Sequence, residues 1–197
     1  WYKYLNKPRK VKSQIDIMKG SYLGPKFSNN EIKNFLEKKS YPYKFLQNKD
    51  VSERISDLIA TQNVIGWFQG RMEFGPRALG GRSILGDPRS PSMQKNLNLK
   101  VKYRESFRPF APSVIRQDLS EWFDMSVDSP YMLLVANINH KKKIEMTNEQ
   151  KNLFGIDKLN IKRSEIPAVT HVDYSARVQT VTKETNSRYY DLISKFK

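Results

Sequence analysis

The sequence predicts a mixed domain of helices and strands, of the α/β or α+β class. Segments with a helical period alternate along the chain with short apolar runs that are typical of strands. At 197 residues the chain has room for one domain of ordinary size or two very small ones. Hydrophobic residues make up 38% of it and aromatic residues 12%, which is enough for a packed core and excludes disorder throughout.

The first expected elements follow a polar lead-in. Residues 1–30 are broken by proline and glycine and are predicted to be irregular. Ser28 and Glu31 stand at capping-box spacing, which predicts the start of a helix. The apolar face of that helix would consist of Ile32, Phe35 and Leu36. Apolar residues at helical spacing then predict an amphipathic helix over residues 51–62.

A strand, a loop and a helix are expected next. Residues 64–68 are a short apolar run, which predicts a buried strand. Glycine and arginine are frequent from 70 to 89, so we expect a loop there. Ser90 and Pro91 suit the N-cap and the first turn of a helix that would reach about residue 100.

The second half of the chain carries four strand candidates. Residues 131–138 give the clearest pattern. Residues 110–115 predict another strand, which Pro112 would confine to an edge or an irregular position. Two further short strands are expected over 168–173 and 177–181.

A charged stretch and a final helix complete the prediction. Residues 140–165 are charged and aperiodic, and we expect an excursion that carries a short helix. Asn186 is expected to start the last helix. The apolar face of that helix would consist of Tyr190, Ile193 and Phe196.

Composition limits the classes of function. The net charge of +15 favours anionic partners such as nucleic acid, nucleotides, phosphorylated metabolites or an acidic domain. The absence of cysteine excludes disulfides, thiolate zinc sites and cysteine nucleophiles, and two histidines exclude a histidine-rich metal site. No apolar run approaches 18 residues, and the chain starts at Trp1 without a signal-peptide core. We therefore expect a cytoplasmic fragment of a longer protein, with no membrane segment.

The arginines are placed more informatively than the lysine runs, which are typical of exposed surfaces. Ten Lys or Arg lie between Arg71 and Arg116, against three acidic residues. Several of these arginines stand among Gly, Pro, Phe and Leu, where a charge needs a partner because burying it alone is costly. Arginine is also the preferred cation for a bidentate grip on phosphate or carboxylate.

Residues 70–85 concentrate these features. Glycines and a proline let the backbone approach a ligand closely, and Arg71, Arg77 and Arg82 supply charge. Backbone N–H groups beside guanidinium groups suit phosphate oxygens. The run matches neither the P-loop nor the Gly-x-Gly-x-x-Gly fingerprint. The alternative is a structural loop in which the glycines only shape turns and Arg77 pairs with Glu73.

Three runs together resemble one enzyme family. Residues 70–85, 107–112 and 170–181 are similar to the C-terminal region of carbamoyltransferases of the nodulation-protein and cephalosporin type, which carbamoylate nodulation factors and antibiotics. Residues 22–28 and 129–132 also resemble that family, in the same order along the chain.

The resemblance implies a YrdC-like domain, a twisted mixed sheet with flanking helices, over residues 31–197 after a linker over 1–30. In such enzymes carbamoyl phosphate and ATP, with Mg²⁺, give a carbamoyl-adenylate in this domain, and the carbamoyl group then passes to an acceptor hydroxyl. An N-terminal actin-like domain of the same chain would hold an iron-type metal. Residues 140–165 would be an insertion. The family segment that follows is lacking after Lys197, so the fragment alone is not expected to be fully active.

The resemblance also suggests roles for individual residues. We expect Arg77 and Arg108 to bind phosphate or carbamoyl phosphate, supported by Lys102 and Arg104. The further cations expected at the nucleotide are Arg71, Arg82 and Arg177. Four aromatic residues are expected in the core rather than as adenine platforms, namely Trp67, Phe68, Trp122 and Phe123.

His171 and Asp173 alternate across one residue, so on a strand they would face the same side. His171 would hydrogen-bond the carbamoyl group or the nucleotide, and Asp173 would orient Arg177 or a magnesium ion. The alternatives are a satisfied histidine and a structural Asp173–Arg177 ion pair. A glycine is common in the family where Tyr174 stands here.

The sequence is compatible with two other functions. A basic RNA-binding module would use the same positive charge, although the aromatic residues are not interleaved with the basic ones as a stacking platform requires. A degenerate docking domain is the other alternative, and it is disfavoured by an intact set of four residues, Arg77, Arg108, His171 and Asp173. The sequence leaves the acceptor and a homodimer undecided.

Overall fold

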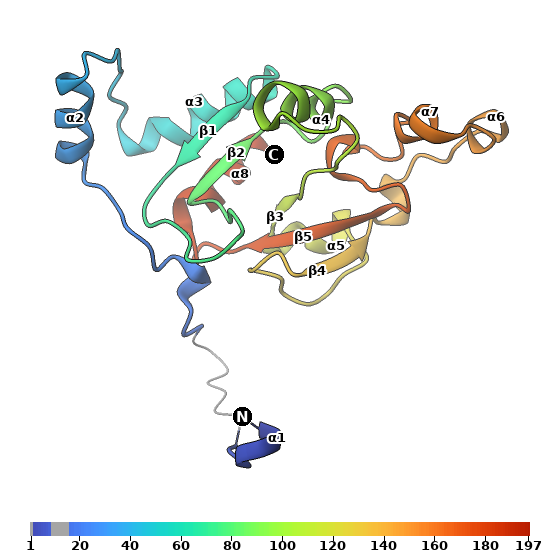
Figure 1. Ribbon diagram of the computed structural model, residues 1–197, viewed down its shortest axis with the longest axis horizontal. Coiled ribbons are helices and arrows are strands. Elements are labelled where there is room, and N and C mark those ends of the chain that lie inside the picture. The colour runs from blue at the N-terminus through green and yellow to red at the C-terminus, as the bar shows by residue number, and fades with distance from the viewer. Residues whose placement is uncertain (1, 9–15) are drawn as a thin grey trace.

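The computed structural model describes residues 2–8 and 16–197, and helices surround two small sheets in it (Figure 1). The strands are β1 (Ile65–Phe68), β2 (Arg82–Leu85), β3 (Ser113–Ile115), β4 (Leu134–Asn137) and β5 (Ser175–Val181). The α-helices are α1 (Tyr2–Leu5), α2 (Asn29–Lys38), α3 (Asn48–Ala60), α4 (Met93–Asn96), α5 (Leu119–Trp122), α6 (Asn148–Lys151), α7 (Gly155–Leu159) and α8 (Ser187–Phe196). The α+β class is confirmed.

The first sheet is an antiparallel pair of β1 and β2, in which Trp67 lies opposite Ser83. Strand β2 falls inside the region expected to be a loop from 70 to 89, so that expectation was wrong there. The sequence of β2 begins with the polar residues Arg82 and Ser83 and therefore lacks an apolar run. Its conformation depends instead on hydrogen bonds to β1.

The second sheet has the order β3-β5-β4, with β5 parallel to β3 and antiparallel to β4. The strands thus form two sheets rather than the single twisted sheet that we expected. Pro112 directly precedes β3, which lies at an edge as predicted. Side chains of β5 alternate between two faces, and Ala176 and Val178 enter a core with Phe123. Arg177 and Gln179 therefore face the other side of this sheet.

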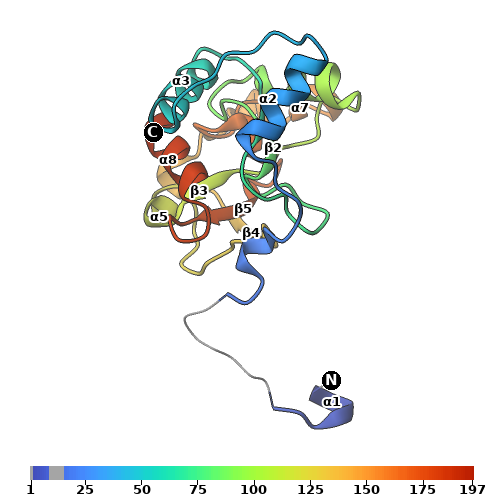
Figure 2. The ribbon, with the colours of Figure 1, turned by 90° about the vertical axis from the view of Figure 1, so that its left-hand side faces the viewer.

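A second core lies between α3, α8 and the β1–β2 pair. Ile59, Trp67, Tyr189 and Leu192 are buried there together with Val181, the last residue of β5. Helices α3 and α8 lie side by side in this core (Figure 2). Because Val181 belongs to it, β5 connects the two cores and fixes one sheet relative to the other.

The predicted start of a helix is confirmed at two places and wrong at one. Ser28 and Glu31 form the capping box of α2, and Asn186 caps α8 through its side chain. Helix α3 contains most of the predicted amphipathic segment, but it begins three residues earlier and ends two residues earlier than expected. The helix expected from Ser90 starts later, with Ser92 at its N-cap. After four residues it continues as a π-helical turn, Leu97–Lys102.

One aromatic prediction and one strand need correction. Trp67 and Phe123 are buried as expected and Trp122 is partly buried, but Phe68 is 45% exposed because its neighbour in β1 takes the inner face. Residues 168–173 form no strand. They contain the end of a 3-10 turn, Pro167–Val169, and a tight turn that leads into β5.

The excursion, residues 140–165, carries α6 and α7 and extends from the edge of the fold (Figure 1). Lys143 and Ser164 pair in an antiparallel bridge at its base, so it leaves and returns at neighbouring points. Among the helices of the described residues, none combines the length and the apolar character that crossing a membrane requires.

Candidate functional site

The loop between β1 and β2, residues 69–81, is folded around a buried carboxylate, and we call it the Glu73 loop. The side chain of Glu73 accepts hydrogen bonds from the backbone N–H groups of Leu79 (2.6 Å) and Gly81 (2.7 Å). Its second oxygen accepts one from Nε of Arg82 at 3.3 Å. The ion pair that we considered between Arg77 and Glu73 is therefore replaced by one between Arg82 and Glu73.

Segments far away in the sequence hold the same loop in place. The carbonyl oxygen of Leu79 accepts hydrogen bonds from the Tyr22 hydroxyl (2.5 Å) and from Nε2 of Gln179 (2.7 Å). The backbones of Gly24 and Met72 are also joined, by an N–H···O bond of 2.9 Å. The lead-in, the loop and β5 thus form one hydrogen-bonded unit.

Two of the predicted nucleotide-binding arginines take part in this unit. Arg71 donates to the carbonyl oxygen of Gly24 at 2.9 Å, and Arg82 donates to that of Gly75 at 2.5 Å. Both guanidinium groups therefore stabilise the loop. Their role at the nucleotide remains a prediction.

Arg77 in the Glu73 loop and Arg177 in β5 are close enough for their charges to interact. Burial lowers the pKa of Arg177, and the positive charge of Arg77 lowers it further. The Nε of Arg177 is buried without a hydrogen-bond partner among the described residues. Neither guanidinium forms an ion pair within residues 2–8 and 16–197. Two half-buried like charges without a carboxylate between them favour the binding of an anion.

A second group of predicted cations lies between α4 and β3. The buried Asn98 donates to the carbonyl oxygens of Ser106 (3.0 Å) and Arg108 (2.8 Å), which fixes the chain at Arg108. Arg104 donates to the side chain of Asn98 at 2.6 Å and stacks over the ring of Phe110. Arg108 is exposed and lies 3.8 Å from Glu105, and Lys102 is exposed at the end of the π-helical turn. Arg104 therefore supports the backbone, whereas the other two cations face solvent.

His171 and Asp173 do not share the face of a strand, because both lie in the turn before β5. The carboxylate of Asp173 accepts hydrogen bonds from Oγ of Ser175 (2.7 Å) and from its backbone N–H (3.0 Å), which lower the pKa of Asp173. This carboxylate therefore caps the start of β5, and the expected contact with Arg177 is not formed. Tyr174 has a φ of 63°, in the left-handed region that favours glycine.

Residues 56–197 match the family model described as carbamoyltransferase C-terminus. The chain belongs to this family. The expected resemblance is thereby confirmed, and the Arg77–Arg177 pair and the Glu73 loop lie within the matched region of this carbamoyltransferase C-terminal domain.

The chain is also similar to individual proteins, two of which have informative names. An uncharacterised protein of Synechocystis is 53% identical over all of this chain and 32% of its own length. Nodulation protein NolO of Bradyrhizobium diazoefficiens is 39% identical over 89% of this chain and 29% of its own length. The 3'-hydroxymethylcephem-O-carbamoyltransferase of Streptomyces clavuligerus is 37% identical over 72% of this chain and 23% of its own length. The chain thus spans a third or less of these relatives.

Sequence reasoning did not assign these structural roles to three residues. Glu73 organises the loop, Asn98 fixes the 106–108 backbone, and Tyr22 joins the lead-in to Leu79. Glu73 was considered only as a partner of Arg77, although an isolated acidic residue in the basic 70–85 run was a usable signal for a larger role. The contacts of Asn98 and Tyr22 gave no signal, because their partners lie on other segments.

Proposed function

We propose that this domain binds carbamoyl phosphate and ATP in a longer O-carbamoyltransferase, and that the Arg77–Arg177 pair is the centre of the anion site. The supporting observation is that these two guanidinium groups are half-buried and their positive charges interact, while neither is paired with a carboxylate among the described residues. Lys102 and Arg108 would add exposed charge from the neighbouring segment. Membership of the family and the name of the Streptomyces clavuligerus relative support the proposal that the transferred group is a carbamoyl group.

The proposed reaction has three steps. Water cleaves carbamoyl phosphate to carbamate and phosphate, and a carbamate oxygen then displaces pyrophosphate from the α-phosphorus of ATP. The acceptor hydroxyl finally attacks the carbamoyl carbon, and AMP leaves. In these steps the chain's arginines would neutralise the charge of the phosphate groups and orient them, which requires no protein nucleophile.

Mg²⁺ would accompany the nucleotide and screen the phosphate charge. The described residues contain no cluster of three or more His, Asp or Glu that could hold the ion. The carboxylate of Asp173 already accepts two hydrogen bonds from Ser175. We therefore expect Mg²⁺ to be held through the phosphates rather than by a protein carboxylate cage.

Calorimetric titration with ATP and Mg²⁺, with and without carbamoyl phosphate, tests this function. Arg77→Met should weaken binding at least tenfold, about 1.4 kcal/mol. The matched control Lys141→Met removes one exposed positive charge from the excursion and should bind like the wild type. Equal affinity of the two variants would contradict the proposal. Salt-dependent binding of RNA, weakened equally by both changes, would favour a nucleic-acid-binding module instead.

A further inference from the structure

A cleft of about 280 Å³ lies between the end of the excursion and the segment around α4. Four segments line it, residues 91–95, 106–109, 159–163 and 167–172, so the end of the excursion forms one wall. Arg77, Arg108 and Arg177 are not among the described residues that line it. We call it the Arg163 cleft, after the most deeply buried cation in its lining.

The lining of the Arg163 cleft carries positive charge only. Lys95, Lys162 and Arg163 contribute three cations, His171 contributes an imidazole, and none of the described lining residues is acidic. The walls also contain apolar groups, among them the ring of Phe107 and the side chain of Val172, which are 45% and 56% exposed. A concave surface of this kind concentrates anions because its charges reinforce one another.

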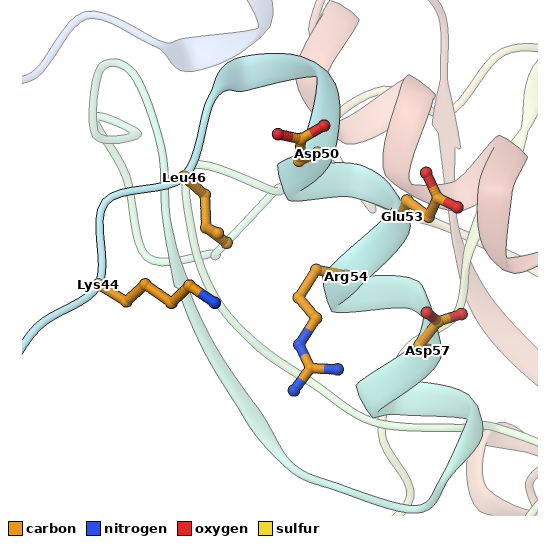
Figure 3. A pocket seen from close by; sticks show the side chains of 6 residues that line it. All are labelled: Lys44, Leu46, Asp50, Glu53, Arg54 and Asp57. Atoms are coloured by element: carbon orange, nitrogen blue, oxygen red, sulfur yellow. The ribbon is translucent and has the colours of Figure 1, made fainter.

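A hollow on the outer surface of α3 shows how different a mixed lining is (Figure 3). Its lining residues are Lys44, Leu46, Asp50, Glu53, Arg54 and Asp57. Three carboxylates and two cations largely offset one another there, and all five of these charged residues are exposed. The hollow therefore favours one ligand charge much less than the Arg163 cleft does.

Arg163 is the decisive group, because it is buried without a counter-ion. Its side chain is 4% exposed, and burial lowers its pKa. The guanidinium donates to the carbonyl oxygens of Lys158, Leu159 (3.2 Å) and Ile161 (3.0 Å), at the end of α7. Its Nε has no acceptor among the described residues. Neutral carbonyls leave the positive charge in place, so the cleft offers a buried cation to an incoming anion.

We propose that the Arg163 cleft binds a small amphipathic oxyanion, a phosphate or carboxylate attached to an apolar group. The oxyanion lies toward Arg163 and the rim lysines, and the apolar group lies against Phe107 and Val172. This site goes beyond the proposed carbamoyl-transfer function, since the cleft is lined by His171 but by none of the arginines that carry that function.

The two histidines of the chain make the test direct. Phenyl phosphate and benzoate are added separately while the imidazole proton signals are followed by NMR. The signal of His171, in the cleft, should move and saturate, whereas that of His140, in the exposed turn His140–Lys142, should not. Saturation by phenyl phosphate alone identifies a phosphate site, and saturation by benzoate alone identifies a carboxylate site.

Charge reversal at the rim tests whether the ligand binds in the Arg163 cleft. The double variant Lys95→Glu/Lys162→Glu changes two exposed residues and should weaken binding at least tenfold. The control Lys141→Glu/Lys151→Glu makes the same change of charge outside the cleft and should leave the affinity unchanged. Arg163→Gln should weaken binding further if the variant folds. Equal shifts of both histidines, no shift of His171, or unchanged affinity in the rim variant would overturn the proposal.

Discussion

The Glu73 loop and the excursion are two long connections that are held in opposite ways. The carbonyl oxygens of Leu79 and Gly80 receive hydrogen bonds from side chains 13 to 106 positions away, including Tyr22, Trp67 and Gln179. The excursion is held mainly by nearby residues, as in the capping box of Thr147 and Gln150. A loop fixed from several distant segments can present Arg77 in one position, whereas a locally bonded segment depends on its own sequence.

The largest expected effect comes from removing the carboxylate at the centre of the loop. Glu73→Ala leaves Arg82 and two buried N–H groups without their acceptor, and should lower the free energy of unfolding by about 4 kcal/mol. Glu145→Ala, at an exposed position of the excursion, should change it by less than about 0.5 kcal/mol. Urea unfolding followed by tryptophan fluorescence measures both. Similar losses in the two variants would remove the contrast between the two regions.

Glycine replacements sharpen the same comparison. Gly80 has a φ of 100°, and an added Cβ would lie 2.2 Å from the ring of Tyr189. Gly80→Ala should therefore destabilise the fold by about 3 kcal/mol. Gly155 in the excursion has a φ of 60° and open space around it, so Gly155→Ala should cost only about 1 kcal/mol. Thermal unfolding of both variants checks the order, and a reversed order would contradict it.

A smaller effect is expected from the bond between the lead-in and the loop. Tyr22→Phe removes the hydroxyl that donates to Leu79 and accepts from Asn186, and should lower the free energy of unfolding by about 1 kcal/mol. Tyr43→Phe is the matched control, because its hydroxyl donates to Glu37 on the exposed surface. Chemical unfolding should show almost no change for that control. If both variants behaved alike, the lead-in would not stabilise the loop.

The smallest effect is a pH dependence at the turn between the excursion and β5. The hydrogen bonds from Ser175 hold the pKa of Asp173 below its ordinary value of 3.8. The stabilisation is therefore complete above about pH 4 and is lost as the pH falls through the lower folded-state value. Because the carboxylate is largely exposed, Asp173→Asn should be less stable at pH 7 by only a few tenths of a kcal/mol. Unfolding at pH 7 and pH 3 should show this difference become smaller in acid, and a constant difference would contradict the assignment.

The parts of the fold that depend on neighbouring residues were predictable. The capping box of Ser28, the cap at Asn186 and the amphipathic pattern of α3 each concern residues within a few positions of one another. Strand β2 was not predictable, because its four residues carry no apolar pattern and depend on pairing with β1. The false strand over 168–173 has the composition of a strand, but Pro167 starts a 3-10 turn there and Tyr174 reverses the backbone at a φ of 63°.

The candidate site also has features that the sequence could predict and features that it could not. Arginines between glycines and prolines predicted an anion site, and Arg77 and Arg177 are close enough for their charges to interact, but their role at a ligand stays a prediction. The sequence could not indicate that Arg82, rather than Arg77, pairs with Glu73, because Arg82 is nine positions away and reaches Glu73 only through the fold of the loop. Nor could it reveal Arg163, since the charged and aperiodic pattern of the excursion gives no sign that this residue is buried.

The contacts of Tyr22 and Gly24 have a practical consequence for the design of truncated variants. The match to the family model begins at residue 56, whereas the Glu73 loop is held from residues 22 and 24. A truncation designed on that boundary would keep every arginine of the proposed anion site and still lose the hydroxyl and the carbonyl that hold its loop. The structural unit around the loop therefore begins before the region that the family model matches.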